Sequence, residues 1–184
     1  MPSQALFCSE NKLVLYCKKR GIMSLRIVRQ TGDEILRKKS KQVSELNDRL
    51  KELIIDMKET MKYHQGCGLA AVQVGVLKRI IICSPNDEEE PAVLINPEII
   101  NESKEQVEDK EGCLSVDGYR GKVLRPKNII VKAKDENMNN IEFDAEDFFA
   151  RVICHEVDHL NGILYTDKVI EGTFEEIKNE EESK

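Results

Sequence analysis

The segment spanning residues 144–160 constrains the fold more than any other, because its apolar residues recur with helical spacing and two histidines lie four residues apart within it. One stripe of such a helix holds two apolar residues and both histidines: Phe148, Val152, His155 and His159. An imidazole that faces a protein interior needs a polar partner. We therefore expect a buried helix whose two histidines point at a shared partner.

The rest of the chain fits a single domain around this helix. At 184 residues and 21.1 kDa, the chain is long enough for one well-formed core and too short for two ordinary ones. No apolar run approaches the ~20 residues that cross a bilayer, so we expect no membrane association. A formal charge of -6 and a pI near 5.3 argue against nucleic acid as a direct ligand, since phosphate binding needs clustered lysine and arginine.

Charge and cysteine usage divide the chain further and indicate its compartment. Four basic residues against one acidic residue give residues 1–22 a formal charge of +3, and we interpret them as a basic extension outside the core. We expect residues 23–170 to form the main domain and residues 171–184 to form an acidic tail that is mobile or marginally helical. Six cysteines without CxxC pairs or a secretory signal predict reduced thiols in the cytoplasm.

The patterns along the chain predict an α+β fold. Apolar residues at steps of three and four predict an amphipathic N-terminal helix over 44–64, with Ser44 as N-cap and Gly66 just beyond its end. Runs of β-branched residues predict short strands at 79–83, 93–95, 129–133 and 141–143, with a solvated acidic turn at 87–91. The C-terminal-half helix is expected to begin at Asp144 and to stop at Asn161 and Gly162. We expect mostly antiparallel strands in small sheets packed around that helix, which would bind a metal.

The strongest local signal is the sequence HEVDH at 155–159. Two histidines four apart on a helix can reach one metal ion, with Glu156 beside them to transfer protons. A catalytic metal needs a third protein ligand, and four side chains compete for that role: Cys113, Cys67, Cys154 and Glu180. Glu180 would make the chain a metalloprotease, whereas a fourth protein ligand would make the site structural in a non-enzymatic module.

A glycine-rich segment upstream, GCGLAAVQ at 66–73, is a second candidate for chemistry. Its small residues let the backbone approach a bound chain closely, and Gln73 can donate a hydrogen bond to a developing oxyanion. A tight turn between a helix and a strand explains the same residues without any chemistry.

Taken in order, GCGLAAVQ at 66–73, EGCLS at 111–115 and HEVDHLNG at 155–162 resemble the three signature motifs of the peptide deformylase family: GxGLAAxQ, EGCLS and HExDH. The form EGCLS is similar to that of the bacterial type. The resemblance begins at GDEILR, residues 32–37, where Glu34 replaces a proline of the family, and it ends near Asp167. Cys154 stands where the family usually has glutamine, and Asp117 where proline is common; both changes concern the pocket surroundings.

The resemblance implies a metal-dependent hydrolase that removes the formyl group from N-formylmethionine of nascent polypeptides and releases formate. Cys113, His155 and His159 would bind one divalent metal, natively iron(II), with zinc, nickel or cobalt as alternatives. Glu156 would act as general base and then acid, while Gln73 and the backbone N–H of Leu114 would form the oxyanion hole. The substrate-binding residues would be Cys67, Gly68, Glu111, Arg120 and Phe148.

The expected partner is the N-terminus of a nascent polypeptide. We expect a cytoplasmic monomer that contacts the ribosome transiently. Because the main body of the chain is acidic, a purely electrostatic grip on ribosomal RNA is not expected, and any contact would involve the basic extension or the tail.

Overall fold

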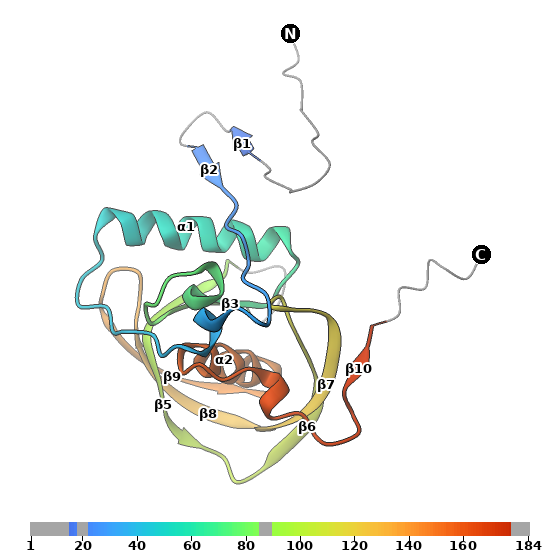
Figure 1. Cartoon of the computed structure of the whole chain (residues 1–184). Helices are drawn as coiled ribbons and strands as arrows, with labels where there is room; N and C mark the ends of the chain where they lie inside the picture. The colour runs from blue at the N-terminus through green and yellow to red at the C-terminus, as the bar shows by residue number, and fades with distance from the viewer. Residues whose placement is uncertain (1–14, 18–21, 85–89, 178–184) are drawn as a thin grey trace.

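The computed structural model describes residues 15–17, 22–84 and 90–177, and within them it contains two α-helices and three sheets (Figure 1). The helices are α1 (Asp48–Tyr63) and α2 (Asp147–Leu160). The largest sheet has five strands in the order β3 (Gly68–Ala70), β4 (Ile80–Cys83), β5 (Ala92–Glu102), β8 (Asn128–Lys134) and β9 (Asn140–Glu146). The second sheet has the order β10 (Glu175–Glu176), β7 (Val116–Pro126) and β6 (Gln106–Cys113).

All strand pairings in these sheets are antiparallel, as the sequence predicts. A third, two-stranded sheet pairs β1 (Leu15–Cys17) with β2 (Ile22–Ser24), and the boundary expected between residues 22 and 23 falls within β2. Short 3-10 helices are η1 (Glu34–Arg37), η2 (Ala71–Val74) and η3 (Tyr165–Asp167). No helix in the described part of the chain is long and apolar enough to span a membrane.

The helix α2 lies at the centre of the main body, with the strands of the two larger sheets curving around it and α1 lying above it in the view (Figure 1). The strand β4 packs against both helices, because consecutive side chains of a strand point to opposite faces. Ile80 and Ile82 belong to the core cluster that packs against α1, whereas Ile81 belongs to the cluster that packs against α2. Because β4 is covered on both faces, all four of its residues, Ile80–Cys83, are buried and apolar.

The two predicted helices exist, but both begin later than expected. The helix α1 begins at Asp48, because the Asn47 side chain accepts a hydrogen bond from the Leu50 N–H at 3.0 Å and serves as the N-cap; the prediction of Ser44 was wrong. At its other end Gln65, with φ 55°, takes the left-handed conformation expected near Gly66.

The helix α2 begins at Asp147, after the cap residue Glu146. The predicted N-cap, Asp144, instead lies in β9 opposite Ile130 of β8, because strand pairing continues up to the helix. The predicted stop is confirmed, since Asn161 is the C-cap and Gly162 follows with φ 77°.

The predicted strands coincide with β4, β5, β8 and β9, except that Arg79 precedes β4, and β5 is much longer than expected at 11 residues. The prediction missed β1, β2, β3, β6, β7 and β10. The helical alternative for the tail was wrong in its described part, because Glu175 and Glu176 form β10 against β7. Most of the predicted acidic turn at 87–91, and Glu180, lie outside the described residues.

Candidate active site

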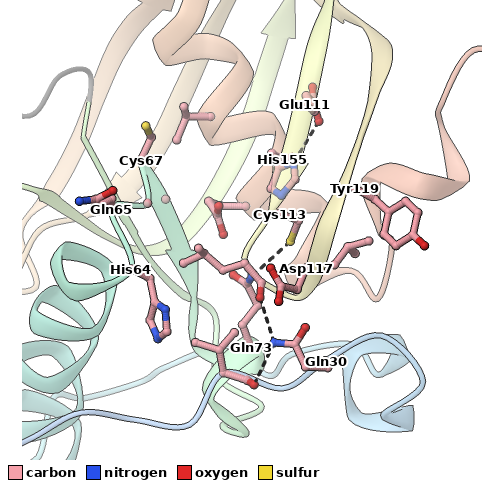
Figure 2. A pocket seen from close by; sticks show the side chains of 18 of the residues that line it. Gln30, His64, Gln65, Cys67, Gln73, Glu111, Cys113, Asp117, Tyr119 and His155 are labelled. Carbon is pink, nitrogen blue, oxygen red and sulfur yellow. Dashed lines mark hydrogen bonds and ion pairs between the residues drawn. The ribbon is translucent and has the colours of Figure 1, made fainter. Parts of the chain in front are cut away.

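A cavity of about 700 Å³ lies between α2, the strand β3 and the β6–β7 strand pair (Figure 2). The three sequence motifs, which are far apart along the chain, meet at this cavity. Its lining includes residues from each of them: Cys67, Gly68, Gln73, Cys113, His155 and Glu156. The antiparallel sheets and the central helix thus bring together the residues that the sequence singled out.

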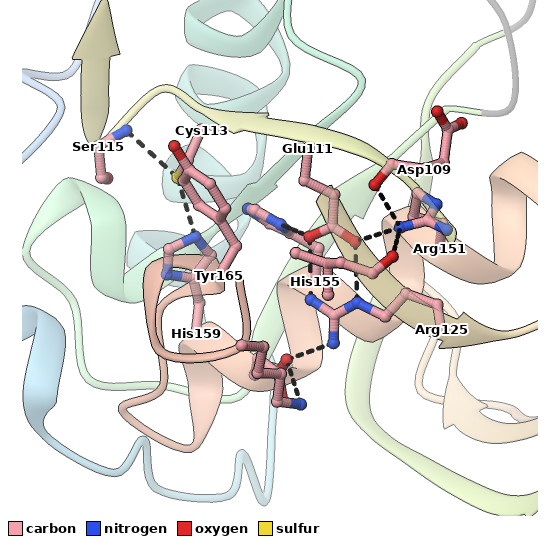
Figure 3. Close-up of polar contacts among 12 residues, drawn as sticks. Asp109, Glu111, Cys113, Ser115, Arg125, Arg151, His155, His159 and Tyr165 are labelled. Atoms are coloured by element: carbon pink, nitrogen blue, oxygen red, sulfur yellow. Dashed lines mark hydrogen bonds and ion pairs between the residues drawn. The ribbon is translucent and has the colours of Figure 1, made fainter. Parts of the chain in front are cut away.

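Cys113, His155 and His159 form a group of metal-binding character. Each offers one ligand atom, and the three atoms lie within 4.8 Å of one another; within the described ranges no other group of three or more such residues occurs. The Cys113 Sγ atom lies 3.2 Å from His159 Nε2 (Figure 3). Both imidazoles are buried, as expected from the apolar stripe on which they lie.

The other thiols that the sequence offered as ligands do not join this group. Cys67 lines the cavity but lies outside the cluster, and Cys154 faces a second cavity on another side of α2. Burial raises the pKa of the Cys154 thiol to about 11. Among the described cysteines, therefore, Cys113 alone accompanies the histidines.

The donor set fits a divalent transition metal. One sulfur and two imidazole nitrogens are ligands that zinc, iron, nickel and cobalt accept, and three protein ligands leave room for water. His155 has its Nδ1 at 2.9 Å from a carboxylate oxygen of Glu111, which leaves its Nε2 available for a cation. Such a carboxylate behind a metal-binding histidine fixes the tautomer and the orientation of the ring.

The two imidazoles differ in their protonation. Burial lowers the pKa of His155, but its hydrogen bonds to Cys113 and Glu111 outweigh burial and set the pKa well above its ordinary value. Burial, together with the charge of His155, holds the pKa of His159 well below its ordinary value. His159 is therefore neutral at physiological pH, whereas His155 must release a proton when a metal binds.

Glu111, which the family resemblance places among the substrate-binding residues, is only 5% exposed, and its carboxylate is fully engaged. Its Oε1 accepts hydrogen bonds from Arg125 Nε at 2.9 Å and Arg151 Nη1 at 2.8 Å. Its Oε2 is bonded to Arg125 Nη2 at 3.0 Å and to His155. Burial raises the pKa of Glu111, but the hydrogen bonds from His155 and Arg125 outweigh burial and hold that pKa well below its usual range. Glu111 therefore stays ionised, and in this anionic form it orients the ring of His155.

Glu156 is the second buried carboxyl group of the site, with 3% of its surface exposed. Burial raises its pKa to about 7, a value suited to both accepting and donating a proton near neutral pH. Its Oε2 has no hydrogen-bond partner among the described residues. The carboxyl group packs directly against the backbone of Gly68, where a Cβ atom would lie 2.9 Å from both Cγ and Cδ of Glu156. Only glycine leaves space for Glu156 at this point of β3.

Gln73 lies in η2, immediately after β3, and its amide is fixed at both ends. Its Oε1 accepts a hydrogen bond from the Ala70 N–H at 2.7 Å, so the NH₂ group points the other way. That NH₂ group donates to Ser115 Oγ at 3.1 Å and lies 3.5 Å from Cys113 Sγ. The orientation places a hydrogen-bond donor beside the metal-binding group. Leu114, the neighbour of Cys113, lines the cavity.

The remaining predicted residues lie in different places. Cys67, Gly68 and Phe148 line the cavity, but Phe148 is 48% exposed at its edge instead of facing inward with the histidines. Arg120 is not among the lining residues, and its Nε donates a hydrogen bond to Glu175 Oε1 of β10 at 2.7 Å.

Sequence reasoning missed the role of Glu111 behind His155 and the two arginines that bind it. A signal was present, because Glu111 precedes Cys113 by two residues and alternate residues of a strand share a face. Likewise, Arg151 precedes His155 by four residues and so shares its helix face. No comparable spacing identifies Arg125.

Comparisons with known proteins agree with this geometry. A family model described as polypeptide deformylase matches residues 25–174. A peptide deformylase of Finegoldia magna is 49% identical over 156 residues, which cover 85% of this chain and 96% of the relative. Peptide deformylase 1 of Clostridium acetobutylicum is 51% identical over 150 residues, which cover 82% and 98%. A solved Acinetobacter baumannii peptide deformylase with Met-Ala-Ser bound matches with a TM-score of 0.76 and 36% identity, covering 80% of this chain and 99% of that one.

Proposed function

This chain belongs to the polypeptide deformylase family, and from that premise we propose how its own residues remove the formyl group from N-formylmethionine of nascent polypeptides and release formate. The observation that carries the proposal is the Cys113, His155 and His159 group, which stands beside a buried glutamate at a cavity of about 700 Å³. The reaction needs a nucleophilic water, a group that transfers its proton, and donors for the charge that develops on the formyl oxygen.

Cys113, His155 and His159 hold one divalent metal ion. When bound, such an ion acts as a Lewis acid and makes water nucleophilic near neutral pH. Iron(II) is the native metal in this proposal, and zinc, nickel and cobalt can replace it, since all accept thiolate and imidazole ligands. The hydrogen bond of 2.9 Å between Glu111 and His155 supports the assignment, because metal-binding histidines are commonly oriented in this way.

Glu156 transfers the proton. Its free Oε2 accepts the proton of the attacking water and then delivers it to the leaving amino group of methionine. A pKa of about 7 supports both steps, because a carboxyl group with this pKa is present in both protonation states near neutral pH. The contact with Gly68 holds the carboxyl group in one place between the two steps.

Gln73 and the backbone N–H of Leu114 donate hydrogen bonds to the oxyanion that develops on the formyl oxygen. The amide of Gln73 is preorganised for this task, because the Ala70 N–H fixes its Oε1 at 2.7 Å and leaves the NH₂ group directed at the site. Preorganised donors stabilise a transition state without reorganising during the reaction, and loss of one typically costs ~10²-fold in rate.

The cavity binds the methionine side chain and the first residues of the polypeptide. Cys67, Gly68 and Phe148 line it, and Arg120 remains a predicted contact for the peptide at its border. A formyl carbon carries only hydrogen, so a narrow site admits it and excludes bulkier acyl groups. The Acinetobacter baumannii relative was solved with Met-Ala-Ser bound, which supports a tripeptide of this kind as a ligand.

The surroundings of the reaction belong to the same proposal. Residues 23–170 form the catalytic domain, with residues 1–22 as a basic extension and 171–184 as an acidic tail. The enzyme acts in the cytoplasm as a monomer and meets the nascent chain during a transient contact with the ribosome.

The proposal is tested by measuring formate release and metal content on protein purified without oxygen. The native chain should release formate from formyl-Met-Ala-Ser but no acetate from acetyl-Met-Ala-Ser. Glu156→Ala should keep its metal and lose activity, whereas Cys113→Ala should lose the metal. A Glu156→Ala variant with native activity would refute the role of Glu156, and native metal content in Cys113→Ala would refute the role of the thiolate.

A further inference from the structure

The proposed metal site is divided between two structural units. Cys113 lies at the end of β6 in the three-stranded sheet, whereas His155 and His159 come from α2. The distance between the sulfur and the imidazoles therefore depends on contacts that join the β6–β7 strand pair to the helix. The inference below rests on the proposed function, because it concerns how that metal site is held together.

Arg151 of α2 is buried with 5% exposure and reaches both strands of this pair (Figure 3). Its Nη2 donates a hydrogen bond to the carbonyl oxygen of Val107 in β6 at 2.7 Å. Its Nη1 donates to the carbonyl oxygen of Val123 in β7 at 3.0 Å and lies 3.5 Å from that of Asp109. One guanidinium group thus bridges the helix and the backbone of both strands.

The same guanidinium also acts on a metal ligand through a shared carboxylate. Arg151 Nη1 donates to Oε1 of Glu111 at 2.8 Å, and His155 Nδ1 lies 2.9 Å from Oε2 of the same group. If the hydrogen bond from Arg151 is lost and the Glu111 carboxylate rotates, the contact between Glu111 and His155 Nδ1 is displaced as well. Arg125 of β7 binds Glu111 as well, from within the same sheet, and it also joins that sheet to α2 through its ion pair with Asp158 at 2.5 Å. Arg151 is the guanidinium that reaches Glu111 from the helix.

We propose that Arg151 is a positioning residue of the metal centre, which fixes the strand pair carrying Cys113 against the helix carrying His155 and His159 and orients His155 through Glu111. Two properties of arginine suit this role. Its planar fork of donors satisfies several acceptors at once, and its charge remains when it is buried. A lysine at the same position would keep the charge but could not bridge two strands and a carboxylate with one fixed geometry.

The test compares metal binding by the native chain, Arg151→Met and Arg151→Lys. Cobalt(II) is the probe, because its binding can be measured by chelator competition and its thiolate-to-cobalt absorption reports on the Cys113 bond. Arg151→Met should weaken cobalt binding by about 10- to 100-fold, the usual effect of removing a group that supports a metal ligand, and should weaken the thiolate-to-cobalt band. Arg151→Lys should recover only part of both signals.

Arg79→Met is the matched control. Arg79 also joins the C-cap of α2 to a strand, since its guanidinium donates to Asn161 Oδ1 at 2.9 Å and to the carbonyl oxygen of Pro97 in β5 at 3.2 Å, but it does not contact Glu111. The Arg79→Met variant should lose stability and keep native cobalt affinity. Native affinity and spectrum in both Arg151 variants would overturn the proposal, whatever their melting temperatures, as would equal losses in Arg79→Met. Failure of the native chain to bind cobalt would instead refute the proposed function.

Discussion

Replacing Gly68 by alanine should disable the reaction without removing the metal. The new Cβ atom would lie 2.9 Å from Cγ and Cδ of Glu156 and closer still to Oε1. Ordinary carbon contacts need ~3.5–4.0 Å, so the carboxyl group must move by on the order of 1 Å. A misplacement of this size typically costs ~10²-fold in rate, and overpacking of a buried site costs about 1–3 kcal/mol of stability.

The assay is formate release from formyl-Met-Ala-Ser, with metal content and melting temperature measured on the same preparations. We expect Gly68→Ala to lose about 100-fold in kcat and to keep its metal, because the three ligands lie outside the overlap. Gly121→Ala is the matched control, since its Cβ would lie 2.8 Å from Val169 Cγ1, a comparable overlap away from the cavity. It should lose stability and keep activity. A folded Gly68→Ala variant with native kcat would refute the assigned position of Glu156.

Three other groups give testable outcomes as well: the metal ligand Cys113, the buried thiol of Cys83 and the ion pair between Arg37 and Asp167. Iron-loaded protein purified under argon should be more active than protein purified in air, because both iron(II) and the Cys113 thiolate oxidise; equal activity with iron bound would contradict this. Cys83 should resist iodoacetamide at pH 8 in the native state and react in urea, because burial raises its pKa to about 12; native-state labelling at the rate seen in urea would show that the thiol is accessible. The hydrogen bond from Arg37 lowers the pKa of Asp167, so this pair stabilises the fold above the ordinary aspartate pKa and ceases to do so as pH falls through the lowered value. Asp167→Asn should therefore lower the melting temperature at pH 7, with a difference that shrinks toward pH 3; a difference independent of pH would contradict the assignment.

The sequence predicted those parts of the fold that leave a periodic signal. The inward-facing histidines follow from the apolar stripe of α2, and the confirmed stop at Gly162 follows from the residue that best adopts a positive φ. The start of α2 could not be predicted in the same way. Asp144 is a good N-cap residue, but pairing with β8 keeps it extended, and such pairing depends on a distant segment.

The strand β6 was not predicted, for a related reason. Only one of the eight residues of β6, Glu111, is buried, so the strand lacks the apolar alternation that marks a half-buried strand. The contacts of Arg151 join groups 28 to 44 residues apart, and Glu111 and His155 are 44 residues apart. These contacts arise only when the sheet closes on the helix.

The central claim is that one thiolate and two imidazoles bind the same cation and leave a position for water. X-ray absorption at the metal edge of zinc-loaded protein tests it most directly. The account predicts one sulfur at about 2.3 Å, two imidazole nitrogens at about 2.0–2.1 Å and one further light atom from solvent. A metal shell without sulfur, or one with two sulfurs and no solvent atom, would contradict it.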